Sequence, residues 1–401
     1  MRQVGLLFIC EALTRTSSMM VFMSIALTGR YLAPDPSLAT LPLALVPVAM
    51  TITTIPAAQM MRRLGRRAGF QLAAVLGVTG AVTCVVALWT EQFAGLCAGG
   101  FLIGSVNGFA TYYRFAASEA APEEYRSRAI SLVMAGGVIA AFVGAAMATA
   151  TKDLNPSAPF LGTFAAIAGI QALILVVVSF SRLPMPSDTE KQDGGRPLRQ
   201  LVGRPTFVLA VLGAVASWGL MSLLMNATPL SMDRHHHSFD DTAQVIQWHV
   251  LGMYVPSFFT GSLIRRVGER PILFLGIALI GLSTALNLLG IDVVHYLAGL
   301  AVLGVGWNFL FIASTTILTG TYAGEGEKAK VQSMNDFLIF STMIVATFSA
   351  GVLENKIGWF GLNQAAAGVV VVVTVLLAML CWQERRGIAK LRSVTSDSQD
   401  N

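Results

Sequence analysis

The stretch that decides the fold is AQMMRRLGRR at residues 58–67, which lies between the apolar runs 38–60 and 69–90. The same pattern returns as GSLIRRVGER at residues 261–270, which is 203 positions later and about half the chain away. Arginines between two apolar runs mark the cytoplasmic ends of two membrane helices, and a glycine allows the turn between them to be tight. The sequence therefore predicts a membrane protein built from two similar halves.

The composition is that of a membrane protein. Of the 401 residues, 54% are hydrophobic and only 12% are charged, whereas soluble domains carry about 25% charged residues. A membrane helix takes about 20 apolar residues, and twelve such segments fit the sequence: 4–28, 38–60, 69–90, 96–119, 129–150, 158–181, 206–229, 242–264, 271–291, 295–320, 330–353 and 361–383. We predict an all-α integral membrane protein with twelve transmembrane helices and no separate soluble catalytic domain.

A polar stretch at residues 182–204 separates two sets of six segments. We predict an N-terminal half at 1–181, a cytoplasmic central loop at 182–205, a C-terminal half at 206–383 and a cytoplasmic tail at 384–401. With both termini inside, 21 of the 27 Lys and Arg residues lie on the cytoplasmic side and four lie outside. This bias fixes the topology, and it explains the net charge of +5 without a nucleic acid partner.

These features resemble the major facilitator superfamily, whose motif after the second span is Gly-x-Leu-Ala-Asp-Arg-x-Gly-Arg-Arg. The first copy matches it at Arg63, Gly65, Arg66 and Arg67, but Ala58 replaces the leading Gly and Arg62 replaces the Asp. The second copy keeps Gly261, Leu263, Arg266, Gly268 and Arg270, with Arg265 at the Asp position. The resemblance implies two six-helix halves with a substrate site between them. It also implies a cytoplasmic gate formed by Arg62, Gly65, Arg66, Arg67, Arg265 and Gly268.

Two further stretches bear on the transport direction and the substrate. The fifth segment reads GGVIAAFVGAA at 136–146 and lacks the Gly-Pro pair of many proton-coupled exporters, which favours uptake. QSMNDF at 332–337 and SAGVLENKIGW at 349–359 are similar to bacterial facilitators whose relatives include riboflavin importers of proteobacteria. The resemblance implies a monomeric carrier in the bacterial inner membrane that takes up a small organic solute with protons and needs no cofactor. Riboflavin is the first candidate for this solute.

Ionisable residues within the predicted spans are functional candidates, because burying charge in lipid costs a few kcal/mol. Glu11, Arg15, Arg114 and Asp336 are of this kind, and we predict a proton or substrate relay from them. Glu11 and Arg15 are four residues apart on one helix face. Glu11 and Arg114 fall at a similar depth, so Glu11 is expected to bridge both arginines. The alternative is a neutralised pair that only holds helices together.

Asp336 lies near the cytoplasmic end of the eleventh span. We expect Arg62 to reach it and so to form a latch between the halves. The alternative is helix capping by Asn335 and Asp336, since carboxylates and amides favour helix N-termini.

Aromatic and amide side chains of the spans are candidate contacts for a flat heterocycle with a polar rim. The candidates are Asn107, Tyr112, Tyr113, Trp218, Asn226, Trp307 and Asn308. The alternative is ordinary packing between membrane helices.

The other function classes find less support in the sequence. The run His235–His237 has no second ligand group, so no metal site is predicted. An enzyme would need a nucleophile paired with a base, and the sequence shows no such pair. Drug or metabolite efflux by proton antiport stays open as an alternative to uptake, and a membrane receptor that does not transport its ligand is a third reading.

Overall fold

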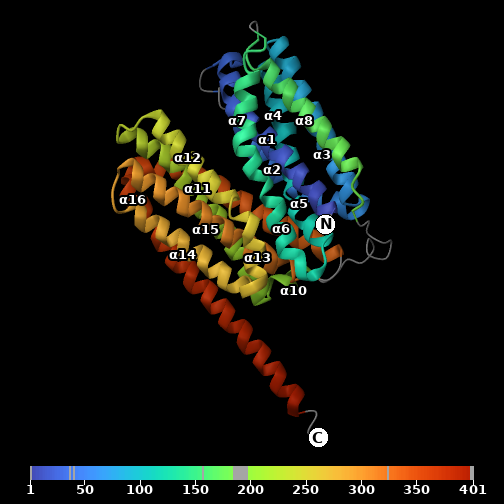
Figure 1. Ribbon diagram of the computed structural model, residues 1–401, viewed down its shortest axis with the longest axis vertical. Coiled ribbons are helices and arrows are strands. Elements are labelled where there is room, and N and C mark those ends of the chain that lie inside the picture. Colours follow the sequence, from blue (N-terminus) through green and yellow to red (C-terminus); the bar gives the residue numbers. More distant parts are fainter. Residues whose placement is uncertain are drawn as a thin grey trace. The chain divides into compact units, whose positions relative to one another are not determined.

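The computed structural model describes residues 2–35, 38, 41–155, 158–183, 197–322 and 325–397. The described residues form helices and turns without a strand (Figure 1). The helices are α1 (Arg2–Leu32), α2 (Leu41–Leu64), α3 (Arg66–Trp89), α4 (Phe93–Ala110), α5 (Tyr113–Glu119), η2 (Glu123–Tyr125), α6 (Arg126–Met134), α7 (Gly136–Thr151), α8 (Leu161–Ser179), α10 (Leu198–Val202), α11 (Pro205–Arg234), α12 (Phe239–Tyr254), α13 (Ser257–Val267), α14 (Glu269–Asn287), α15 (Val293–Thr319) and α16 (Glu325–Asp397). The predicted all-α fold is confirmed.

The twelve predicted spans are recovered in these helices. Ten helical stretches of described residues are long and apolar enough to cross a bilayer. The stretch Glu327–Glu384 holds two spans, because Gly358 interrupts α16 with a φ of 68° and a ψ of −178°. The eighth predicted span is not among the ten, because a break at residues 255–256 divides it into the shorter helices α12 and α13. Pro256 lies at that break, where it has no amide hydrogen to donate.

The chain forms two compact units. Unit 1 comprises Met1–Asp193, Tyr254–Arg265 and Gln332–Ile344, and unit 2 comprises Gly194–Met253, Arg266–Val331 and Val345–Asn401. Unit 1 therefore contains α13 up to Arg265 and an early part of α16 in addition to the first helices of the chain. The division into halves at 1–181 and 206–383 stays a prediction.

Small residues let the helices of each unit approach closely. In unit 1, α4 packs on α2 and α3, and α1 packs on α7 and α8. A Cβ built on Gly99 of α4 would lie 2.7 Å from the Gly80 carbonyl oxygen of α3. In unit 2, α15 packs on α11 and α14, and a Cβ on Gly306 would lie 2.9 Å from the Ile280 amide nitrogen. Close backbone contact replaces hydrophobic burial as the source of helix association in lipid.

The repeated sequence motif folds into a repeated turn. Gly65 joins α2 to α3 with a φ of 84° and a ψ of 162°, and Gly268 joins α13 to α14 with a φ of 90° and a ψ of 162°. This combination is essentially restricted to glycine. The prediction that both glycines allow a tight turn is confirmed.

We expect Gly268→Ala to lower the free energy of unfolding by about 1–3 kcal/mol, since alanine is strained in this backbone conformation. Steric crowding does not contribute, because a Cβ there would lie 3.7 Å from the Pro271 Cδ. Thermal unfolding of the purified protein in detergent measures the effect. The control is Gly169→Ala, which meets nothing within 4 Å in the middle of α8 and should be neutral or stabilising. Equal unfolding midpoints for the two variants would contradict the expectation.

Candidate functional site

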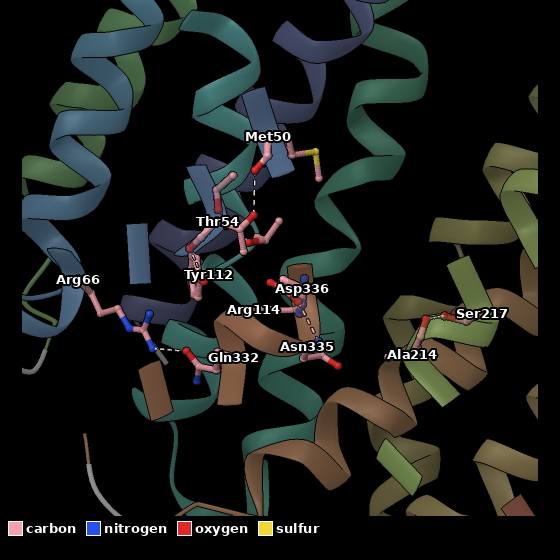
Figure 2. Close-up of polar contacts among 12 residues, drawn as sticks. Met50, Thr54, Arg66, Tyr112, Arg114, Ala214, Ser217, Gln332, Asn335 and Asp336 are labelled. Atoms are coloured by element: carbon pink, nitrogen blue, oxygen red, sulfur yellow. Dashed lines mark hydrogen bonds and ion pairs between the residues drawn. The ribbon is translucent and has the colours of Figure 1, made fainter. Parts of the chain in front are cut away.

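A buried ion pair of unit 1 joins Arg114 on α5 to Asp336 on α16. Their side chains are 5% and 0% exposed, and an Arg114 Nη2 hydrogen is donated to Asp336 Oδ1 (Figure 2). Asn335 donates to the same oxygen from its Nδ2 at 2.8 Å. The second carboxylate oxygen, Oδ2, has no hydrogen-bond partner among the described residues. Removing the Arg114 guanidinium would leave the Asp336 carboxylate buried without this cation.

The structure corrects two expectations about Asp336. The predicted latch with Arg62 is wrong, because the residue that pairs with Asp336 is Arg114. Helix capping by Asn335 and Asp336 is also wrong. Helix α16 begins at Glu325, and at 3.6 residues per turn Asp336 lies about three turns into it. Its carboxylate is therefore beyond the first turn, where a helix N-terminus stabilises anions.

A second polar cluster, the Arg66 network, joins α3, α5 and α16. Arg66 donates two hydrogen bonds to Glu119, from Nη2 to Oε1 at 2.7 Å and from Nε to Oε2 at 3.2 Å. Its Nη2 also donates to Gln332 Oε1 at 2.7 Å, as Figure 2 shows. The guanidinium carbon lies 5.4 Å from the centre of the Tyr112 ring. Two parallel bonds to one carboxylate give an arginine both strength and a fixed orientation.

Glu119 and Gln332 were missed in the sequence. Glu119 ends α5 and looks like an ordinary interfacial acid, and Gln332 carries no charge. One signal pointed to Gln332. It lies four residues before Asp336, so both side chains belong to the same face of α16. That face meets Arg114 and Arg66.

Glu11 and Arg15 on α1 form the predicted pair. Arg15 Nε donates to Glu11 Oε1 at 2.7 Å, and the Glu11 side chain is 2% exposed. The expectation that Glu11 also bridges to Arg114 is wrong. Glu11 Oε2 has no hydrogen-bond partner among the described residues, and Arg114 pairs with Asp336 instead. The buried acids Glu11 and Asp336 thus each keep one oxygen without a hydrogen bond.

Three of the candidate substrate contacts lie in unit 1. Asn107 on α4 accepts a hydrogen bond from the Ser18 hydroxyl of α1 at 2.8 Å. The Tyr112 hydroxyl donates to the Thr54 carbonyl oxygen at 2.9 Å. The Tyr113 ring lies 4.4 Å from the Phe70 ring, measured between centroids. Both tyrosines are fully buried, and Ser18 is half-buried.

The other four candidates lie in unit 2. The Trp307 ring stacks on Phe311 at 5.2 Å and meets the edge of the Trp218 ring at 5.1 Å. Trp218 Nε1 is buried without a hydrogen-bond partner among the described residues. Asn308 donates to the Met253 carbonyl oxygen at 2.6 Å. Asn226 donates to the Ser222 carbonyl oxygen at 2.6 Å and to the Thr347 hydroxyl at 3.2 Å.

Glu354 is a buried acid of unit 2. Its side chain is 2% exposed, and the Arg234 guanidinium lies 3.6 Å from Oε1. In the same unit, His235 bonds to the Ser231 carbonyl oxygen at 2.7 Å and His237 to the Ile291 carbonyl oxygen at 2.6 Å. His235 and His237 therefore fasten the end of α11 to its surroundings.

Comparisons with known proteins agree with this architecture. Residues 7–246 match the model of the Major Facilitator Superfamily. The chain is 39% identical to the riboflavin transporter RfnT of Brucella anthropi over 380 residues, which cover 94% of this chain and 95% of that protein. It is 24% identical to the uncharacterized MFS-type transporter YddS of Bacillus subtilis, over 90% of this chain and 86% of that one.

Solved structures agree on the fold. The Escherichia coli fucose:proton symporter FucP superposes with a TM-score of 0.75 at 15% identity, covering 94% of this chain and 98% of that one. A bacterial homologue of the iron transporter ferroportin superposes with a TM-score of 0.72 at 14% identity, covering 95% of this chain and 100% of that one.

Proposed function

Since the chain belongs to the major facilitator superfamily and is a multi-pass membrane transporter rather than an enzyme, we propose that it imports riboflavin. The uptake is driven by protons and proceeds by alternating access in the bacterial inner membrane. Both termini lie in the cytoplasm, and the working unit is a monomer. The observation that carries this proposal is the 39% identity to a riboflavin transporter over almost the whole length of both chains.

The chemistry of the candidate residues supports a flat, polar-rimmed solute. The isoalloxazine ring offers two aromatic faces, and the ribityl chain offers hydroxyls. Trp218 is half-buried and provides aromatic surface, and its Nε1 hydrogen has no described acceptor. Trp307 is fully buried and supports the Trp218 ring through their edge contact. Asn107 bonds to the half-buried Ser18, and Asn226 bonds to the exposed Thr347. Both asparagines carry amide groups suited to hydroxyls. Tyr112, Tyr113 and Asn308 act on the solute through the helices they contact, because their side chains are at most 1% exposed.

Proton coupling is assigned to Glu11, Arg15, Arg114 and Asp336. A coupling acid must bind and release a proton while shielded from bulk water. Glu11 and Asp336 are both almost fully buried, and each faces one arginine. Protonation of either carboxylate would weaken its ion pair and free the helix that carries it. The supporting observation is that α5 and α16 meet through one such pair.

The cytoplasmic gate is assigned to six residues of the repeated motif together with the Arg66 network: Arg62, Gly65, Arg66, Arg67, Arg265 and Gly268. Gly65 and Gly268 set the turns, and Arg66 binds Glu119 and Gln332. Arg265 of the second copy lies 5.1 Å from the Tyr125 ring centre. Arg62 and Arg67 belong to the same turn as Arg66. On this assignment, opening to the cytoplasm breaks the bonds of Arg66 before the solute leaves.

Uptake of labelled riboflavin by a riboflavin auxotroph tests the proposal. Cells that express the chain should grow at a riboflavin concentration where cells with the empty vector do not, and a protonophore should stop accumulation. Asn107→Ala should raise the KM severalfold, because it removes one hydrogen bond to the solute. The matched control, Asn355→Ala, removes an exposed amide that accepts a hydrogen bond from Arg234 and should leave the KM unchanged. Outward pumping of riboflavin would favour efflux, and an absence of any riboflavin flux would refute the substrate.

A further inference from the structure

The cytoplasmic end of α2 carries an open groove that the transport mechanism does not use. The groove has a volume of about 400 Å³ and is lined by Pro56, Gln59, Met60, Arg63 and Leu64. All five residues belong to one stretch of α2 within unit 1. Pro56 and Gln59 are exposed, and Leu64 is 54% exposed.

Arg63 brings a positive charge to this groove. It is exposed, and it makes no hydrogen bond or ion pair with the part of the chain that the structure describes. Its neighbour Arg66 is 8% exposed and bound to Glu119 and Gln332. The two arginines of one motif therefore differ in role: Arg66 acts within the protein, and Arg63 presents its charge outward.

The groove matches the order of groups from the headgroup of a phospholipid to its first acyl carbons. Arg63 lies seven residues after Pro56, which corresponds to about 10 Å along the helix. In the proposed orientation Arg63 is at headgroup level and Pro56 is within the hydrocarbon region. The Gln59 amide lies between them, at the depth of the ester groups. Met60 and Leu64 provide apolar contact for an acyl chain beside this polar line.

We propose that this groove is a binding site for an anionic phospholipid of the cytoplasmic leaflet. Its phosphate pairs with the Arg63 guanidinium, and its first acyl carbons pack on Pro56 and Met60. Charge complementarity selects this occupant, because the cytoplasmic leaflet carries the anionic lipids and attracts basic residues next to the membrane. Arginine suits a phosphate because its planar group offers two parallel hydrogen bonds.

The test uses the full chain reconstituted in nanodiscs of phosphatidylcholine with added phosphatidylglycerol. Native mass spectrometry after gentle release counts the phosphatidylglycerol molecules that stay bound. Arg63→Gln should weaken retention about fivefold, the effect of one arginine near an anionic surface. Gln59→Trp, which keeps every arginine but fills the groove, should weaken retention as well. In pure phosphatidylcholine both variants should unfold at the wild-type temperature, since both side chains are exposed.

The internal repeat supplies a matched control. Arg266 occupies the same place in the second motif copy, 203 residues later, and is also exposed. Arg266→Gln should leave retention at the wild-type level. Equal losses for Arg63→Gln and Arg266→Gln would show general attraction to the leaflet and would overturn the proposal. Equal retention of phosphatidylcholine and phosphatidylglycerol by the wild type would overturn it too. Neither result bears on riboflavin uptake.

Discussion

Arg114→Ala is expected to abolish transport and to prevent recovery of folded protein. The substitution leaves the Asp336 carboxylate inside the protein without its cation, and Asp336 is 0% exposed. Breaking a buried pair by removing one partner costs about 3–5 kcal/mol, which is a large part of the 5–15 kcal/mol that typically stabilises a protein. The measurements are the yield of monodisperse protein in detergent, its unfolding temperature, and riboflavin uptake in cells.

A double variant separates the effect of the buried charge from the effect of losing the side-chain volume. Arg114→Gln with Asp336→Asn removes both charges together, so no uncompensated charge stays buried. We expect it to recover much of the folded protein while transport stays low, because the coupling acid is gone. The control is Arg126→Ala, which breaks an exposed ion pair with Glu123 at 3.5 Å. Exposed pairs contribute at most about 1 kcal/mol, so this variant should behave like the wild type. A folded and active Arg114→Ala protein would disprove the importance of the pair.

Glu11→Gln is expected to abolish proton-driven accumulation and to preserve downhill exchange. Glutamine fills the same space and accepts a hydrogen bond from Arg15, but it cannot take up a proton. The Glu11 side chain is 2% exposed, and its Oε2 has no described hydrogen-bond partner. Reconstituted vesicles separate the two activities. Counterflow of riboflavin should continue, whereas an imposed proton gradient should no longer concentrate it.

The control for this experiment is Glu91→Gln, which makes the same chemical change at an exposed position. It should accumulate riboflavin as the wild type does. Wild-type accumulation by Glu11→Gln would remove Glu11 from the coupling role and leave Asp336 as the acid of the relay. Loss of both accumulation and counterflow would point to a structural role for the Glu11–Arg15 pair.

The sequence by itself determined the helices, the turns and the local ion pair. A membrane helix satisfies its own backbone hydrogen bonds within about 20 residues, so the apolar runs locate the spans without knowledge of their neighbours. The glycines at 65 and 268 fix their turns through backbone sterics alone. Glu11 and Arg15 meet because they are four residues apart on one helix. All of these are properties of neighbouring residues.

Only the tertiary structure decided which polar side chains meet across helices. Arg114 and Asp336 are 222 positions apart, and Arg66 and Gln332 are 266 apart. Both contacts depend on how α5, α3 and α16 are rotated about their axes. One residue corresponds to about 100° of rotation at 3.6 residues per turn, so span boundaries known to a few residues leave the facing side chain undetermined. The rotation in the folded protein gives Asp336 the partner Arg114 rather than Arg62.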